Sequence, residues 1–261
     1  MIKIAVCVKQ ILDPEIPAKV FKIDPEAKRA IPPQGAEFVI SDYDESAVEA
    51  ALKIKDSYET KITVISLGPE SAKSTIRRCI AMGADEGILL SDPLFDDSDS
   101  FATAFILAEA IKKLGDFGLI LCGRQEGDWD AGQVGSGIAE LLGIPSATMV
   151  GKIEVKNGKA VIVERIVSDG REIVEVPLPA LLTVGSEIGE ARYPSLRRIR
   201  DASKVEIPTW NAENIAVAKS KNKMLTLFVP TREDRCEFIQ GENPEEAGSN
   251  LAVKLSQAKL I

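Results

Sequence analysis

The chain alternates short apolar runs with longer amphipathic segments along its first half. The runs Ile2 to Val8 and Lys61 to Leu67 are rich in β-branched residues, as expected of strands buried on both faces. The shorter runs Gly87 to Leu90 and Phe117 to Cys122 predict two more strands. Helices are expected between the strands, at 41–56, at 69–83 and from about 98 to 114. This alternation favours right-handed crossovers and a largely parallel, doubly wound α/β sheet.

The pattern changes after a further helix expected from about Gly132 to Leu142. An Asn157-Gly158 pair between two alternating runs predicts a β-hairpin, so antiparallel strands follow the parallel ones, and 171–176 and 180–184 continue the sheet. The chain then turns polar and loop-like from Gly185 to Trp210. The rest has little core potential before a final helix, and we expect it to be an arm that packs on another subunit.

Composition and charge narrow the classes of protein that fit. The 261 residues are 45% hydrophobic and 28% charged, enough for a substantial core in one large or two small domains, which excludes disorder and fibres. The net charge of -8 repels polyanions and argues against a general nucleic-acid-binding protein. Because histidine is absent, no Ser-His-Asp or Cys-His nucleophile, His-ligated metal or imidazole acid-base step is available.

The cysteines are widely spaced and form no CxxC pair, which argues against zinc, iron-sulfur and dithiol redox sites. We expect Cys7, Cys79, Cys122 and Cys236 to be buried free thiols in a reducing compartment. The apolar run at the N-terminus is too short for a signal peptide, and no later segment is long enough to insert into a membrane. We therefore expect a cytoplasmic protein.

The loop after the strand that ends at Cys122 is the most unusual one. Ligands of open α/β sheets bind outside the carboxyl ends of the strands, so this loop should converge with those after Val8 and Leu67. It reads CGRQEGDWDAGQVGSGIAELLG and leads into a helix whose first turn carries Gly132, Gln133 and Gly135. Such glycines let backbone amides approach a phosphate, and the helix N-terminus adds partial positive charge, so a nucleotide pyrophosphate suits the site.

The same loop also fits a generic glycine-rich turn, because its spacing is neither GxGxxG nor that of a P-loop. Asp128 and Asp130 sit badly beside a phosphate unless they bind sugar hydroxyls or loop amides, or face solvent. Arg124 could pair with a phosphate or with a carboxylate.

Six separated blocks of the sequence resemble the β subunit of electron-transfer flavoproteins. They are VCVKQILD at 6–13, DYDESAVEAAL at 42–52, GPESAKSTIRRCIAMGAD at 68–85, LILCGRQ at 119–125, DAGQVGSGIAELLGIP at 130–145 and RYPSLRRIRDASK at 192–204. The resemblance runs in order over most of the chain and fades after about Pro208. It implies a Rossmann-like nucleotide-binding domain that pairs with a larger, FAD-containing α subunit.

The family carries either a structural AMP or, in its electron-bifurcating members, a second FAD in the β subunit. The QVG at 133–135, with Asp128 and Asp130 ahead of it, is similar to the FAD-holding type, so we favour FAD over AMP. Carried over by motif, the cofactor-binding residues are Cys7, Ser41, Asp42, Tyr43, Asp44, Val64, Leu67, Gly123, Arg124, Gln125, Glu126, Gly127, Asp128, Trp129, Asp130, Ala131, Gly132, Gln133, Val134 and Gly135.

Two departures from the family pattern affect this site. Trp129 stands where FAD-type members usually have a small glycine, and its indole could stack on the isoalloxazine or adenine ring or cover the loop against a neighbouring subunit. The usual MNPYD before the first helix is ISDYD at 40–44 here, so the family's Asn and Pro have no counterpart in this chain and the contacts they make are not carried over.

The RYPSL motif resembles the family's partner-recognition loop, in which a leucine, here Leu196, inserts into a pocket of the dehydrogenase. An exposed apolar anchor in an arginine-rich rim suits an interface hot spot, and Pro194 keeps the loop extended. On this resemblance, the partner-binding residues are Arg192, Tyr193, Pro194, Ser195, Leu196 and Arg197, with Arg198 and Arg200 in the rim. The alternative is a surface loop with solvated arginines and no partner-binding role. The expected organisation is a nucleotide-binding domain at 1–184, a partner-recognition loop at 185–204 and a C-terminal arm on the α subunit at 205–261.

The resemblance implies an electron-transfer subunit of an oxidoreductase complex rather than a stand-alone enzyme, because the flavin performs the redox chemistry. A bifurcating member would exchange electrons with NAD(H), with ferredoxin or flavodoxin, and with an acyl-CoA or 2-hydroxy acid dehydrogenase. One alternative is an ordinary carrier with AMP. A stand-alone adenine-nucleotide-binding protein is another, although it would have little use for the tail and the Leu196 loop. A nucleotide hydrolase lacks a Walker lysine and a convincing metal-binding cluster.

Overall fold

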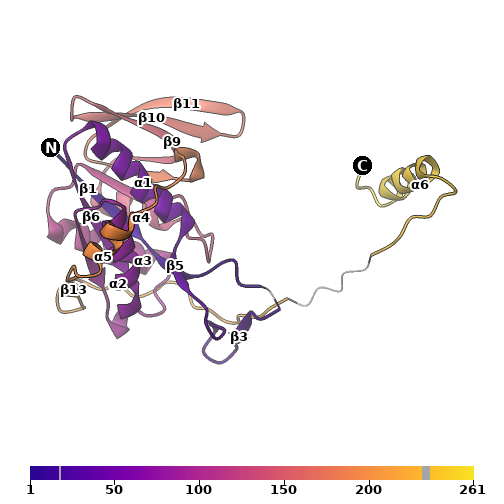
Figure 1. The fold of residues 1–261 in the computed structure, drawn as a ribbon, viewed down its shortest axis with the longest axis horizontal. Helices are drawn as coiled ribbons and strands as arrows, with labels where there is room; N and C mark the ends of the chain where they lie inside the picture. The colour runs from indigo at the N-terminus through magenta and orange to yellow at the C-terminus, as the bar shows by residue number, and fades with distance from the viewer. Residues whose placement is uncertain (18, 231–235) are drawn as a thin grey trace. The chain divides into compact units, whose positions relative to one another are not determined.

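The computed structural model describes residues 1–17, 19–230 and 236–261. The chain divides into two compact units, Met1–Thr226 and Leu227–Ile261. The first unit holds the sheet and its helices, and the second holds a single helix, α6 (Pro244–Gln257) (Figure 1). Among the described helices, none is both long and apolar enough to cross a bilayer.

The first unit is built on a nine-stranded sheet of order β11-β10-β9-β12-β8-β1-β6-β7-β13. Its neighbouring strands from β9 through β12 to β13 run parallel, whereas the β9-β10 and β10-β11 pairs are antiparallel. The strands are β1 (Ile2–Val8), β6 (Thr60–Leu67), β7 (Glu86–Leu90), β8 (Leu119–Gly123), β9 (Ser146–Lys156), β10 (Ala160–Val167), β11 (Gly170–Pro177), β12 (Ala180–Val184) and β13 (Thr209–Trp210). The predicted α/β class, with antiparallel strands added to a mostly parallel sheet, is confirmed.

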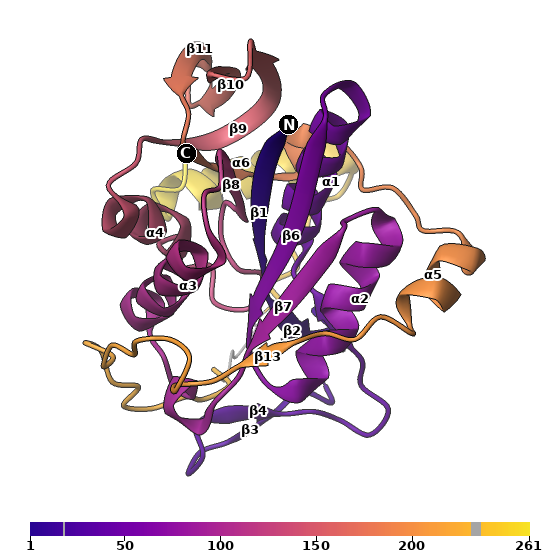
Figure 2. The ribbon, with the colours of Figure 1, turned by 90° about the vertical axis from the view of Figure 1, so that its left-hand side faces the viewer.

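Helices cover both faces of the parallel strands (Figure 2). On one face, α1 (Asp42–Ser57) and α2 (Lys73–Met82) bury apolar side chains against Ile4 and Val6 of β1. On the other face, α3 (Ser100–Leu114) and α4 (Val134–Leu142) pack on Ala5 and Cys7 of the same strand. Successive side chains of β1 therefore pack alternately into two hydrophobic cores, which explains why the strand is apolar on both faces.

Several turns follow from local chemistry. Asn157 and Gly158 both adopt positive φ, at 53° and 65°, as a tight hairpin turn requires, so the predicted β9-β10 hairpin is confirmed. Gly83 ends α2 with a φ of 140°, a conformation that side-chain-bearing residues rarely adopt. Short 3-10 turns lie at η1 (Glu70–Ala72), η2 (Pro93–Phe95) and η3 (Ser186–Ile188).

The proline-bearing stretch between β1 and α1 contains two small antiparallel pairs that the sequence pattern did not predict. They are β2 (Gln10–Leu12) with β5 (Phe38–Ile40), and β3 (Lys22–Asp24) with β4 (Arg29–Ile31). Each strand is only three residues long, so no alternation of apolar and polar residues develops along it.

The segment after Gly185 is less loop-like than expected. Helix α5 (Leu196–Ala202) begins inside the RYPSL motif, and its cap is Ser195, whose Oγ accepts a hydrogen bond from the Arg198 N–H at 3.4 Å. Farther along, β13 extends the sheet, and Ile207 and Ile215 are buried. Residues 205–226 thus belong to the first compact unit, and the unit boundary falls after Thr226.

The expectation of four buried thiols is wrong for one of them. Cys7, Cys79 and Cys122 are buried, whereas Cys236 is exposed in the second unit. The physical reason is that α6 and the residues described around it contain no buried side chain, so this unit offers no core to a small apolar residue. Its apolar side chains are largely exposed, among them Phe228, Phe238, Leu251 and Leu260.

Candidate functional site

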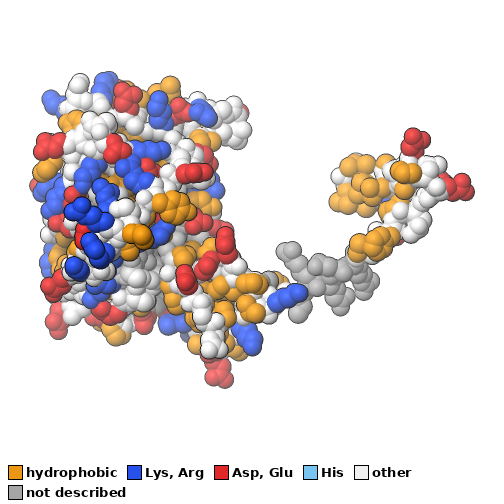
Figure 3. All heavy atoms as spheres, viewed as in Figure 1, with side chains coloured by type: hydrophobic (Ala, Val, Ile, Leu, Met, Phe, Trp, Pro, Cys, Tyr) orange, Lys and Arg blue, Asp and Glu red, His pale blue; other side chains and the backbone are white. Residues whose placement is uncertain are grey.

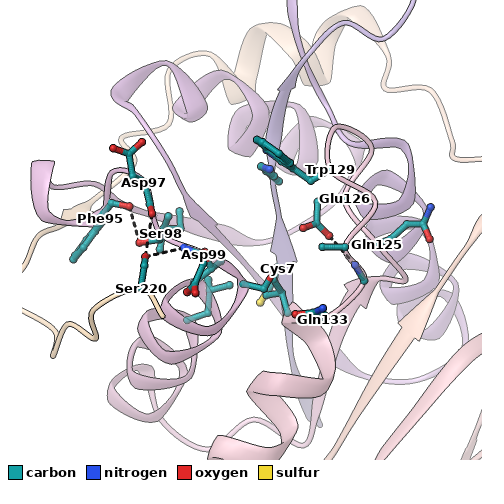
Figure 4. A pocket seen from close by; sticks show the side chains of 18 of the residues that line it. Cys7, Phe95, Asp97, Ser98, Asp99, Gln125, Glu126, Trp129, Gln133 and Ser220 are labelled. Atoms are coloured by element: carbon teal, nitrogen blue, oxygen red, sulfur yellow. Dashed lines mark hydrogen bonds between the residues drawn. The ribbon is translucent and has the colours of Figure 1, made fainter. Parts of the chain in front are cut away.

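A cleft of about 1020 Å³ lies at the carboxyl ends of β1, β6 and β8. Figure 4 shows Cys7 at its floor, with Gln125 and Glu126 to one side. This is the edge at which ligands of doubly wound sheets bind. Of the residues proposed from the sequence, the cleft is lined by Cys7, Asp44, Leu67, Gly123, Arg124, Gln125, Glu126, Trp129, Ala131, Gly132, Gln133, Val134 and Gly135.

The remaining proposed residues lie behind or beside the wall. Val64 is fully buried in the core beneath the cleft, among the side chains under α1 and α2. Ser41 is also fully buried, and its Oγ accepts a hydrogen bond from the Gly127 N–H at 3.2 Å, which ties the long loop to the start of α1. Asp42, Tyr43, Asp128 and Asp130 do not line the cleft either.

The two loop aspartates have partners within the protein. The Asp128 carboxylate forms an ion pair with the Lys9 ammonium at 2.7 Å. Asp130 accepts a hydrogen bond from Gln125 Nε2 at 2.8 Å, and the Glu126 carboxylate accepts one from the Gly132 N–H at 3.2 Å. These contacts fold the loop on itself, and because neither Asp128 nor Asp130 lines the cleft, the electrostatic objection to an anion there is weakened.

Asp44 joins the ends of two strands at the base of the cleft. Its carboxylate accepts hydrogen bonds from the Lys9 N–H at 2.8 Å and the Gly123 N–H at 3.1 Å. Burial outweighs these bonds and raises the pKa of Asp44 to about 7. A Cβ at Gly123 would lie 2.5 Å from Asp44 Oδ1, so only glycine allows this approach.

Arg124 places a cation directly after the carboxyl end of β8. Its guanidinium lies 4.8 Å from the centre of the Tyr43 ring, and its Nη1 is 3.6 Å from a carboxylate oxygen of Glu187. The buried Nε has no hydrogen-bond partner among the described residues. This Nε has almost no accessible surface, so a ligand can reach Arg124, which lines the cleft, only through the outer nitrogens of its guanidinium.

The N-terminus of α4 borders the cleft. The helix begins at Val134, one residue later than Gln133, so Gly132 and Gln133 precede the first turn that they were expected to form. A Cβ at Gly135 would lie 2.8 Å from Cγ2 of Thr183 on β12, so this glycine lets α4 pack closely on the sheet. The free N–H groups of the first turn can donate to an anion in the cleft.

Two thiols lie side by side on the floor of the cleft. The pairing of Val6 with Leu121 places Cys7 beside Cys122 on neighbouring parallel strands, and both belong to the core under α3 and α4. A hydrogen bond with Cys7, together with burial, raises the pKa of Cys122 well above its ordinary value. Cys122 is therefore a neutral thiol at pH 7. Apart from Cys7 and Cys122, no thiol of the described residues lines the cleft.

Three stretches of the cleft wall carried no signal in the sequence. They are 27–29 in the β3-β4 hairpin, 95–100 before and at the start of α3, and 220–224 near the end of the first unit. Each contributes polar side chains, and only 98–100 falls in an element predicted from the sequence, the helix expected from about 98 to 114. Only the folded chain brings them together, because they are separated by as many as 196 residues.

The proposed partner-binding residues differ in their surroundings: Tyr193 and Leu196 are exposed, whereas Arg192 is held in ion pairs within the protein. Tyr193 and Leu196 are 91% and 86% exposed. Figure 3 shows Lys and Arg side chains gathered over the face that carries α5. Arg192 instead turns inward, where its guanidinium forms ion pairs with the buried Glu49 at 2.9 Å and with Asp56 at 2.7 Å.

The fold and the cleft define a doubly wound α/β domain with a ligand site at the carboxyl edge of its parallel strands. A family model described as "Electron transfer flavoprotein domain" matches residues 30–215. The chain therefore belongs to the electron transfer flavoprotein family. Its similar proteins place it among the β-type subunits, which confirms the resemblance noted in the sequence.

Three relatives illustrate this similarity. The "Electron transfer flavoprotein subunit beta" of Clostridium acetobutylicum is 42% identical over 264 residues, covering 99% of both chains. The "Caffeyl-CoA reductase-Etf complex subunit CarD" of Acetobacterium woodii is 39% identical over 267 residues, covering 99% of this chain and 100% of the relative. The "Acryloyl-CoA reductase electron transfer subunit gamma" of Anaerotignum propionicum is 34% identical over 273 residues, with the same coverage.

Proposed function

We propose that this chain holds FAD in the cleft and acts as the β subunit of a bifurcating or confurcating electron transfer flavoprotein. The volume of the cleft is the observation that carries the choice of FAD. At about 1020 Å³ it reaches the upper end of the range for small-molecule sites, roughly 300 to 1,000 Å³, and so has room for a dinucleotide.

The residues present fit such a group. The N-terminus of α4 offers backbone donors to the pyrophosphate, and the outer guanidinium nitrogens of Arg124, which lines the cleft, offer further donors. The indole of Trp129 is 53% exposed at the rim, where it can stack on an aromatic ring of the cofactor. When bound, the flavin supplies the one-electron and two-electron redox chemistry.

The protein's own contribution is to bind, orient and dock. Asp44 fixes the spacing of the β1 and β8 ends beneath the cofactor. The exposed apolar residues of the second unit, which include Phe228 and Phe238, would pack on the FAD-containing α subunit. Leu196 and Tyr193 would insert into the dehydrogenase, with the α5 arginines as a polar rim.

The electron partners follow from the family and from the relatives' names. NAD(H) and ferredoxin or flavodoxin would exchange electrons on one side, and a flavoprotein dehydrogenase on the other. Two relatives bear the names of caffeyl-CoA and acryloyl-CoA reductase complexes, which favours an acyl-CoA dehydrogenase over a 2-hydroxy acid enzyme.

The Arg124→Gln substitution tests the site. The complex with the α subunit should lose the FAD of the cleft on purification, because the guanidinium donors at the carboxyl end of β8 are removed. The FAD of the α subunit should stay. Arg200→Gln is the matched control, since Arg200 is an exposed arginine of α5 that does not line the cleft. Equal flavin content in both variants, measured after acid release, would contradict the assignment of Arg124 to the cofactor.

A further inference from the structure

A segment near the end of the first unit forms one side of the cleft. Residues 220–224, here called the strap, line it through Ser220, Asn222, Lys223 and Met224. Figure 4 shows Ser220 hydrogen-bonded within a cluster that includes Asp97 and Asp99, on the opposite side of Cys7 from Gln125. The strap contains no helix or strand, so backbone pairing does not hold it in place.

Asp99 connects the strap to the start of α3. One carboxylate oxygen accepts a hydrogen bond from the Ala102 N–H at 2.9 Å and caps the helix. The other accepts from the Lys221 N–H at 2.8 Å, the Asn222 N–H at 2.9 Å and Asn222 Nδ2 at 3.2 Å. Although burial raises the pKa of Asp99, these hydrogen bonds outweigh it and hold the pKa below its ordinary value, so the carboxylate is charged at pH 7.

Neighbouring contacts support the same arrangement. Ser220 Oγ donates to the Asp97 carbonyl at 3.0 Å and accepts from the Asp99 N–H at 3.0 Å. The Lys28 ammonium donates to the Met224 carbonyl at 2.8 Å and so joins the strap to the β3-β4 hairpin. All the hydrogen bonds that hold the strap are exposed, so no buried contact keeps it in place. Because Asp99 accepts three of these bonds, its substitution should release the strap most readily.

We propose that Asp99 is a positioning residue that holds the strap as a wall of the cleft and thereby sets how fast a bound nucleotide leaves. This inference rests on the proposed function, because it requires a nucleotide in the cleft. The side of the cleft formed by the ends of β1, β6 and β8 is part of the sheet and cannot open without unfolding. The strap, in contrast, can detach once its hydrogen bonds to side chains break. Release of the ligand should therefore follow release of the strap.

The test uses the Asp99→Asn variant in the complex with the α subunit. Asparagine keeps one oxygen, which suffices to cap α3, but its amide NH₂ cannot accept from the Lys221 and Asn222 donors. The complex is mixed with isotope-labelled FAD and AMP, and loss of the original ligand is followed by mass spectrometry. We expect the cleft ligand to exchange at least about tenfold faster, since even one of the three charge-assisted hydrogen bonds lost accounts for a factor of this size. Amides of 220–224 should exchange hydrogen faster as well.

Asp92→Asn is the matched control. Asp92 also caps a short helix, through the Leu94 N–H at 2.8 Å, and also holds a distant segment, through the Ala212 N–H at 3.0 Å, but it does not line the cleft. Its variant should exchange the ligand at the wild-type rate. Should Asp99→Asn fail to fold, Ser220→Ala removes two strap contacts without touching the α3 cap and should accelerate exchange by a smaller factor.

The outcomes are distinct. Faster hydrogen exchange in the strap with an unchanged rate of ligand release would overturn the inference and leave the proposed function intact. Unchanged exchange of both would show that Asp99 does not hold the strap. A wild-type complex that carries no nucleotide beyond the α-subunit FAD would contradict the proposed function and this inference together.

Discussion

Replacing Gly135 by alanine tests whether the N-terminus of α4 holds the phosphates. The glycine lies in the first turn of the helix and borders the cleft. An added Cβ would lie 2.8 Å from Cγ2 of Thr183 and 3.5 Å from Cβ of Cys122, which belong to the neighbouring strands β12 and β8. The substitution therefore pushes the start of the helix away from the sheet.

The displacement can be worked out from these distances. Ordinary van der Waals contact begins at 3.4 Å, so the start of α4 must move from 2.8 Å by at least about 0.6 Å, or the sheet must yield by the same amount. Overpacking of this kind costs about 1–3 kcal/mol of stability. Because hydrogen bonds weaken steeply with misplaced donors, we expect nucleotide affinity to fall by roughly tenfold, which is about 1.4 kcal/mol.

Gly137→Ala separates the two effects. Its Cβ would lie 2.9 Å from the Cβ of Ala104 on α3, so it strains the same helix, but Gly137 does not line the cleft. Urea unfolding should show similar losses for both variants, whereas titration calorimetry with FAD and AMP on the stripped complex should show weaker binding for Gly135→Ala alone. Wild-type affinity in a destabilised Gly135→Ala variant would refute the phosphate assignment.

Other variants probe the floor and the docking edge. Burial raises the Asp44 pKa from 3.8 to about 7, so the folded state binds the proton more tightly and stability falls as pH rises from 3.8 to about 7. In urea titrations, the nucleotide-free protein should lose at most about 1.4 kcal/mol of stability per pH unit relative to Asp44→Asn. The same pH dependence of stability in both proteins would disprove the raised pKa. Leu196→Ala should raise the KM for the dehydrogenase about tenfold or more with unchanged flavin content, because the side chain is 86% exposed and acts as an anchor; an unchanged KM would remove it from the interface.

The parallel sheet could be predicted from the sequence because its strands are buried on both faces. The run Ile2 to Val8 is apolar at every position but Lys3, and a long helix that needs a crossover follows it. The strand-end site followed from the topology, since the loops after β1 and β8 must meet at one edge. The glycine and aspartate pattern of the long loop then located the cleft.

The remaining walls were not predictable, because short elements and side-chain contacts leave no periodic signal. The strap is held by Asp99 across more than 120 residues, and nothing in the sequence near either end indicates this pairing. The role of Arg192 was likewise hidden, since only the fold brings Glu49 beside it. Helix α5 was missed although Ser195 is a good cap, because its seven residues are mostly exposed and charged.

The content of FAD and AMP in the purified complex tests the central claim most directly. The chain is co-expressed with its α subunit, the non-covalent ligands are released with acid, and both nucleotides are quantified per heterodimer. We predict two FAD and no AMP, one FAD being held in the cleft between β1, β8 and α4. One FAD and one AMP would contradict the proposed FAD site and make this chain the β subunit of an ordinary electron carrier.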